Sequence, residues 1–154
     1  MKKENIVHSL LSVIMLSIVT IGALLLVNYN QKNIGLLFVA VGLLHLIILK
    51  LFGVYFKSVW PDLVFGLIDN GILVIAAIIG ADIAGAFGAI IGGSAANAFT
   101  DGLAGIFEGW TAQYLRQQKI EEKRTILRSA VGKMAGCFLG AGVVLIIAWN
   151  VLSF

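Results

Sequence analysis

The side chains best suited to chemistry in this 154-residue sequence carry oxygen atoms inside long apolar runs. They are Asp69, Asn70, Asn97, Asp101 and Glu108. Carboxylate and amide oxygens are the ligands that hard divalent cations prefer. A carboxylate at the centre of a membrane costs about 2.5–3.5 kcal/mol or more, so it is expected to face protein or water. These five residues are therefore predicted to form an intramembrane metal site.

Three of these residues fall on one side of a predicted helix. A helix turns 100° per residue, so Asn97, Asp101 and Glu108, together with Gly105, lie within about 80° of one another. The rest of this segment, from about Phe87 to Tyr114, is mostly apolar or small. The pattern predicts one polar stripe on an otherwise apolar helix. Glu108 is nearer the membrane surface, where its carboxylate can equally extend toward water, so its role stays open.

The two aspartates are predicted to lie at a similar depth. Asp69 follows Trp60 by nine residues, and Asp101 precedes Trp110 by nine residues. With both tryptophans at the cytoplasmic interface, the two carboxylates lie roughly 13 Å inside it on antiparallel helices. Like charges at one level cannot both stay ionised cheaply, so a proton or a cation must compensate them. A divalent ion that protons can replace meets this requirement.

A purely structural role for the same residues is the alternative. Asp69 and Asp101 can also be protonated and hydrogen-bonded to neighbouring backbone. Asn70 and Asn97 can also link helices through hydrogen bonds. An ion or proton site is favoured, because ionisable residues inside apolar spans commonly mark ion or proton pathways. His45, in another apolar run, is expected to pack between helices rather than relay protons.

The elements that must hold this site are membrane helices. The sequence is 60% hydrophobic and 12% charged, against roughly 25% charged in soluble domains. Apolar stretches of about 20 residues recur, which is the length a helix needs to cross a bilayer. The predicted fold class is all-α, a polytopic membrane protein with five transmembrane helices. The expected spans are Ile6–Val27, Ile34–Phe56, Trp60 to about Gly80, about Phe87 to Tyr114, and Met134–Leu152.

Positive charge predicts the orientation of these spans. Lysines and arginines precede the first span, flank the turn after the second, and fill the connection between the fourth and the fifth. This distribution places the N-terminus in the cytoplasm and the C-terminus outside. The first span follows Lys2 and Lys3, but it is longer than the apolar core of a signal peptide, so an uncleaved helix is expected. A bacterial inner membrane is the expected location.

The glycines divide the chain into two parts. Fourteen of the 18 glycines follow Pro61. Residues 1–57 are predicted to form a two-helix N-terminal hairpin that packs toward lipid. Residues 58–154 are predicted to form a Gly-rich three-helix core with a short basic cytoplasmic loop at 115–128. Small-residue ridges, which favour close helix packing or a homodimer seam, are Gly88/Gly92, Gly105/Gly109 and Gly132/Gly136/Gly140.

Several classes of function are excluded by what the sequence contains. Its single cysteine, Cys137, excludes a disulfide framework and a multi-cysteine metal site. The net charge of +3 sits mainly in short loops, which fits membrane orientation and not nucleic-acid binding. Common catalytic motifs such as the P-loop and H-E-x-x-H do not occur. We expect neither an enzyme nor a prosthetic group.

The segments around the two aspartates also carry recognisable motifs. The first reads Asp69-Asn70-Gly71, and the second reads Gly93-Ser94-Ala95-Ala96-Asn97 followed by Thr100-Asp101-Gly102-Leu103. These motifs resemble the opening helical hairpin of the vacuolar iron transporter family of divalent-metal transporters. With the later stretch LRSAVGKMAGCFLGAG, the match runs from about Leu63 to Gly142. The resemblance implies a dimer with its ion path near the two-fold axis.

Departures from the family pattern bear on the choice of ion. The family's first-helix aspartate aligns best with Asn70, and its second-helix methionine falls on Gly105, so a thioether ligand is missing. A short basic stretch, Arg116–Arg128, stands where the family has a long acidic metal-binding domain. Ligation by oxygen alone suits Mn²⁺, Mg²⁺, Ca²⁺ or Fe²⁺ better than softer ions.

The expected function is that of a small divalent-cation transporter. Fe²⁺ or Mn²⁺ is the suspected cargo, and exchange against protons is one form of the mechanism. Asp69 and Asp101 would be charged ligands, Asn70 and Asn97 neutral ones, and Glu108 would attract cations at the cytoplasmic mouth. The expected partners are the lipid bilayer, a second copy of the chain, divalent cations and protons. Two alternatives remain, a membrane scaffold or assembly protein that transports nothing, and a cation channel.

Overall fold

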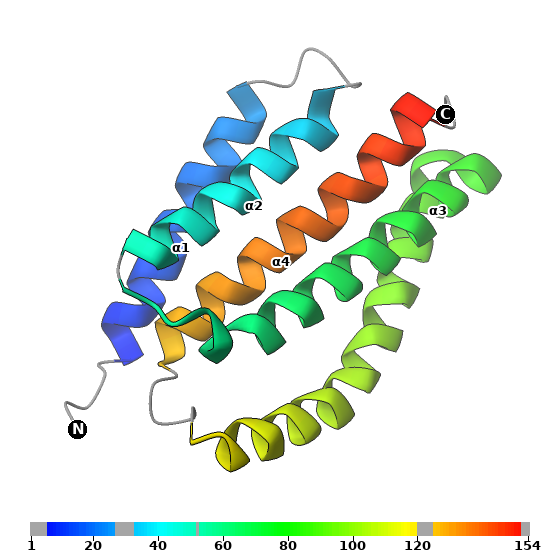
Figure 1. The fold of residues 1–154 in the computed structure, drawn as a ribbon. Helices are drawn as coiled ribbons and strands as arrows, with labels where there is room; N and C mark the ends of the chain where they lie inside the picture. Colours follow the sequence, from blue (N-terminus) through cyan, green and yellow to red (C-terminus); the bar gives the residue numbers. More distant parts are fainter. Residues whose placement is uncertain (1–5, 27–32, 52, 120–124, 152–154) are drawn as a thin grey trace.

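The computed structural model describes residues 6–26, 33–51, 53–119 and 125–151, which are helical almost throughout. Three of the helices are long and apolar enough to cross a membrane, which indicates an integral membrane protein. The all-α class predicted from the sequence is confirmed. The elements are α1 (Ile6–Leu26), α2 (Ile34–Leu51), the short 3-10 helix η2 (Phe56–Ser58), α3 (Trp60–Gln117), α4 (Ile126–Ile146) and its π-helical continuation η4 (Ile147–Val151) (Figure 1).

The long helix α3 folds back on itself and forms two arms (Figure 1). The reversal lies at Ala84 and Gly85, whose φ/ψ angles of −143°/28° and 59°/−143° are not helical. A positive φ is readily adopted by glycine because it has no Cβ atom. We call residues 60–83 the first arm and residues 86–117 the second arm. The reversal falls in the segment where the sequence predicted a connection between two spans.

Glycines bring the two arms together next to the reversal. A Cβ atom added to Gly88 would collide with the backbone of Gly80, and one added to Gly92 would collide with the backbone of Ala76. The arms therefore touch through their main chains, as the predicted Gly88/Gly92 ridge requires. This close approach sets the distance between the arms in the part that lies between the reversal and the polar residues.

Helix α4 lies between α2 and the first arm (Figure 1). The Gly132/Gly136/Gly140 ridge rests on the first arm, where added Cβ atoms at Gly136 and Gly140 would meet the carbonyl oxygens of Leu63 and Leu67. On the opposite side of α4, Gly35 and Gly42 of α2 approach the helix at similarly short distances. These small residues replace the bulky side chains that would otherwise separate the helices.

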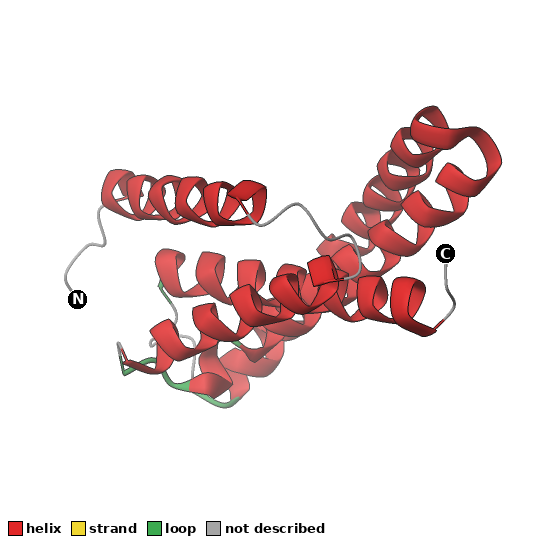
Figure 2. Cartoon of the chain, turned by 90° about the horizontal axis from the view of Figure 1, so that it is seen from above, coloured by secondary structure: helices red, strands yellow, loops and turns green. Residues whose placement is uncertain are grey.

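Helix α1 forms a separate outer layer (Figure 2). Its partly buried Leu16 packs against the small buried cluster of Leu49, Val59 and Val131, which joins α2, the start of α3 and α4. Most of its described large side chains are exposed. An apolar exposed face of this kind suits contact with lipid.

Two predicted helix boundaries need correction. The second span was expected to reach Phe56, but α2 ends at Leu51, because Gly53 has a φ of 67° and its N–H bonds the Lys50 carbonyl at 3.0 Å. The fifth span was expected to begin at Met134, but α4 begins at Ile126.

The early start of α4 follows from a helix cap. The Thr125 side chain accepts a hydrogen bond from the backbone N–H of Arg128 at 3.3 Å, which satisfies one of the first free donors of the helix. The basic segment predicted as a loop over 115–128 is consequently helical at both of its ends. Residues 120–124 of this segment lie outside the described residues.

Candidate functional site

Asp69 on the first arm is bound to the second arm. Its side chain is 8% exposed, and its Oδ1 atom accepts a hydrogen bond from the hydroxyl of Thr100. Thr100 is itself buried, at 3% exposure. The bond joins residues that are 31 positions apart in sequence, and it links the arms at a point far from the reversal. Thr100 was not among the residues predicted for the site.

Asp69 and Thr100 line a cavity of about 180 Å³ between the arms. The remaining walls are apolar side chains of both arms, namely Phe65, Ile68, Ile72, Leu103 and Phe107. The rings of Phe65 and Phe107 lie with their centroids 5.8 Å apart. The cavity therefore has one polar end and walls of hydrocarbon.

Asn70, the next residue along the first arm, faces α4. Its side chain hydrogen-bonds the thiol of Cys137. One turn earlier on α4, the Nζ atom of Lys133 lies 4.1 Å from the centroid of the Phe65 ring. Helix α4 thus brings a thiol to Asn70 and an ammonium group to Phe65, and neither of these side chains was predicted for the site.

Asn97 and Asp101 form a second pair, on the outer side of the second arm. The Nδ2 atom of Asn97 donates a hydrogen bond to Oδ2 of Asp101 at 2.9 Å, and both side chains are exposed. This bond places the two side chains on one side of the helix, as the predicted stripe requires. Glu108, the third member of the stripe, lies on the same arm, and its side chain falls outside the described ones.

The predicted site residues are therefore divided among separate contacts. Asp69 bonds Thr100, Asn70 bonds Cys137, and Asp101 bonds Asn97. Thr100 and Asp101 are neighbours in sequence, so their side chains leave the helix about 100° apart, one inward and one outward. Among the described side chains, no three of the His, Cys, Asp and Glu type come together as ligands of one ion. The metal site stays a prediction.

His45 lies in a packing position on α2. It is 1% exposed, and its Nδ1 atom donates a hydrogen bond to the carbonyl of Val41 at 2.8 Å. Its ring centroid is 5.5 Å from that of Phe138 on α4. These contacts agree with the packing role expected for this histidine.

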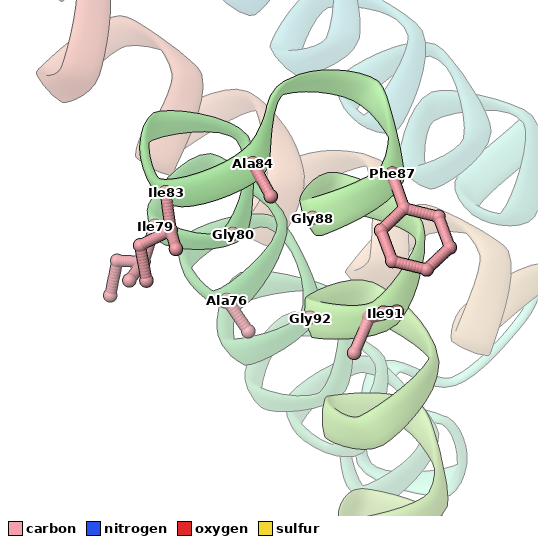
Figure 3. Close-up of a pocket in the computed structure, with 9 residues that line it drawn as sticks. All are labelled: Ala76, Ile79, Gly80, Ile83, Ala84, Phe87, Gly88, Ile91 and Gly92. Atoms are coloured by element: carbon pink, nitrogen blue, oxygen red, sulfur yellow. The ribbon is translucent and has the colours of Figure 1, made fainter.

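A larger hollow of about 420 Å³ lies beside the reversal of α3 (Figure 3). Ala76, Ile79 and Gly80 line it from the first arm, and Phe87 and Ile91 line it from the second. The lining side chains are apolar, so they offer no ligand to an ion.

Comparison with known proteins supplies no relative from which a role can be transferred. No family model, no curated protein and no solved structure matches this chain. The resemblance to vacuolar iron transporters therefore stays a prediction that rests on the motifs at 69–71 and 93–103. The function has to be inferred from the positions of the polar residues.

Proposed function

We propose that this chain is a divalent-cation transporter that works as a homodimer in a membrane. The observation that supports the proposal is the exposed pair of Asn97 and Asp101 on an apolar helix arm. A carboxylate inside a bilayer is costly when it faces lipid, so such residues usually face protein or a water-filled path. In the proposed dimer, a second copy covers this face.

The proposal includes five membrane spans, namely α1, α2, the two arms of α3, and α4 with η4. A straight helix of 58 residues would be about 87 Å long, nearly three times the thickness of the hydrocarbon core. The reversal at Gly85 divides it into arms of roughly 36 and 48 Å, each long enough for one crossing. With the N-terminus in the cytoplasm, as the basic residues predict, the reversal lies on the outer side.

A two-fold axis beside the second arm would complete an ion site. Each copy would supply the carboxylate of Asp101 and the amide oxygen of Asn97, which gives four protein ligands, and water would complete the shell of a hard divalent ion. The same arm leaves open space where Cβ atoms would stand on Gly102 and Gly109. Small residues of this kind allow a second helix to approach closely.

The other predicted site residues would support this centre. Asp69 holds Thr100, the residue before Asp101, and so sets the rotation of the second arm. Asn70 ties the first arm to α4 through Cys137. Glu108 would draw cations to the cytoplasmic mouth. When the ion leaves, two facing Asp101 carboxylates cannot both stay ionised cheaply, so protons would replace it. Metal–proton exchange follows from this arrangement.

The decisive experiment is metal flux in proteoliposomes. We expect Mn²⁺ or Fe²⁺ to cross with the wild-type protein and the flux to be lost with Asp101→Asn, which removes the charged ligand. The matched control is Asp82→Asn, an exposed aspartate near the reversal, which should keep the flux. An Asp101→Asn protein that transports as well as the wild type would exclude the proposed site.

A scaffold function is the second candidate, and one observation favours it. Asp69 and Asn70 each have a partner on a neighbouring arm or helix, Thr100 and Cys137, as residues that only hold helices together would. A scaffold would show no flux in the wild type, while Asp101→Asn would change its oligomeric state. A cation channel would instead conduct without moving protons in exchange.

A further inference from the structure

The cavity between the two arms of α3 is separate from the proposed transport centre. Asp69 and Thr100 line it, whereas Asn97 and Asp101 do not. It also differs in chemistry, because a single carboxylate faces walls made of Phe65, Phe107 and aliphatic side chains. This combination raises the question of what it can bind.

A divalent metal ion does not suit this cavity. Hard divalent ions take six or more oxygen ligands, from protein or retained water. The described lining offers the carboxylate of Asp69 and the hydroxyl of Thr100, and one carboxylate oxygen is already engaged by that hydroxyl. The apolar walls cannot hydrogen-bond the waters that would complete the shell.

A small organic cation suits it better. One buried carboxylate balances one positive charge, and hydrocarbon walls match alkyl groups. Among the described residues, the Asp69 carboxyl group accepts a hydrogen bond from the Thr100 hydroxyl and forms no ion pair with a lysine or an arginine. One of the cavity-lining rings already contacts a cation within the protein, since the ammonium group of Lys133 lies 4.1 Å from the centre of the Phe65 ring.

The size of the cavity and its rim limit the ligand further. An engineered apolar cavity of about 150 Å³ in another protein holds benzene, which has six non-hydrogen atoms. A cavity of about 180 Å³ accordingly admits a molecule of similar size. Ile68 and Leu103 line it and are also exposed, so the opening lies on the outer surface of the arms, where an amphipathic cation dissolved in lipid arrives.

We propose that this cavity binds a small alkylammonium cation. The ammonium group lies against the Asp69 carboxylate, and the alkyl groups fill the space between Phe65, Phe107 and the aliphatic walls. This site goes beyond the divalent-cation function and does not depend on it, because it uses residues of a single copy and leaves Asp101 out.

Binding of tetramethylammonium chloride to the full-length protein in lipid nanodiscs tests the proposal by titration calorimetry. Tert-butanol, a neutral molecule of the same shape and size, is the ligand control. We expect saturable binding of tetramethylammonium and none of tert-butanol. Asp69→Asn should weaken the affinity by about tenfold or more. Asp101→Asn should leave it unchanged, even though this variant abolishes the proposed metal flux.

A second pair of variants keeps the test decisive if Asp69→Asn does not fold. Leu103→Trp places a large side chain at the exposed rim and should block binding. Ile106→Trp adds the same side chain at a position on the same arm that is 74% exposed and outside the cavity lining, so it should bind normally. Absence of saturable binding in the wild type, equal binding of tert-butanol, loss of binding in Asp101→Asn, or full affinity in Leu103→Trp would each overturn the proposal.

Discussion

The hydroxyl of Thr100 donates a hydrogen bond to the carboxylate of Asp69 and so joins the two arms of α3. Near the reversal the arms are held by backbone contact at Gly88 and Gly92. The Thr100–Asp69 bond holds them further along, between two buried side chains. Because Thr100 points inward, the next residue, Asp101, points outward. The orientation of the proposed metal ligand therefore depends on this bond.

Thr100→Val should destabilise the protein and disturb transport. Valine has nearly the same shape as threonine but cannot donate to Asp69, so a buried carboxylate loses its partner. We expect the free energy of unfolding to fall by about 1–2 kcal/mol, which a denaturant titration in detergent micelles measures. Ser17→Ala is the control, because among the described residues the Ser17 hydroxyl bonds the carbonyl of Val13 on its own helix and reaches no other helix. Equal stability of Thr100→Val and wild type would show that the bond does not hold the arms.

The helices could be predicted from the sequence because apolar runs of this length have one stable form in a membrane. Their ends could not be predicted with the same accuracy, because single residues determine them. Gly53 ends α2 through its positive φ, and Thr125 starts α4 through its side-chain cap. Apolar residues continue past Gly53, so a reading of apolar length extends α2, whereas Arg128 and Lys133 interrupt the apolar run after Thr125, so the same reading shortens α4.

The candidate site was predictable in part. Helical periodicity correctly placed Asn97 and Asp101 on one side of the second arm. Periodicity gives the angle between two residues, but it does not show which side of the helix meets the neighbouring arm. The depth match between Asp69 and Asp101 likewise gives a level and no rotation. Thr100 was missed for this reason, since it lies in the motif but on the inward side.

Gly140→Ala should be among the most damaging small substitutions in this protein. The added methyl group would collide with the carbonyl of Leu67, and a backbone atom cannot move aside as a side chain can. We expect a loss of about 1–3 kcal/mol, or separation of α4 from the first arm, as for an overpacked core. Gly71→Ala is the matched control, because the one contact that its methyl group would make with the described residues is with Val144, at an ordinary 3.9 Å. Thermal unfolding followed by circular dichroism compares the two, and equal midpoints would contradict close packing of α4 on the first arm.

The proposed dimer can be tested by disulfide cross-linking in native membranes. Ala98 is exposed beside the Asn97–Asp101 pair, so Ala98→Cys in a Cys137→Ala background should form a disulfide between two copies on oxidation. Such a bond requires Cα atoms within about 7 Å, which only a close two-fold contact provides. Phe99→Cys is the control, because the side chain of Phe99 leaves the helix about 160° away from that of Asp101 and is also exposed.

A dimer band on denaturing gels with Ala98→Cys alone would place the second copy over Asp101. Cross-linking of Phe99→Cys with none of Ala98→Cys would instead put the second copy on the opposite side of the second arm. Another protein would then have to cover the exposed carboxylate.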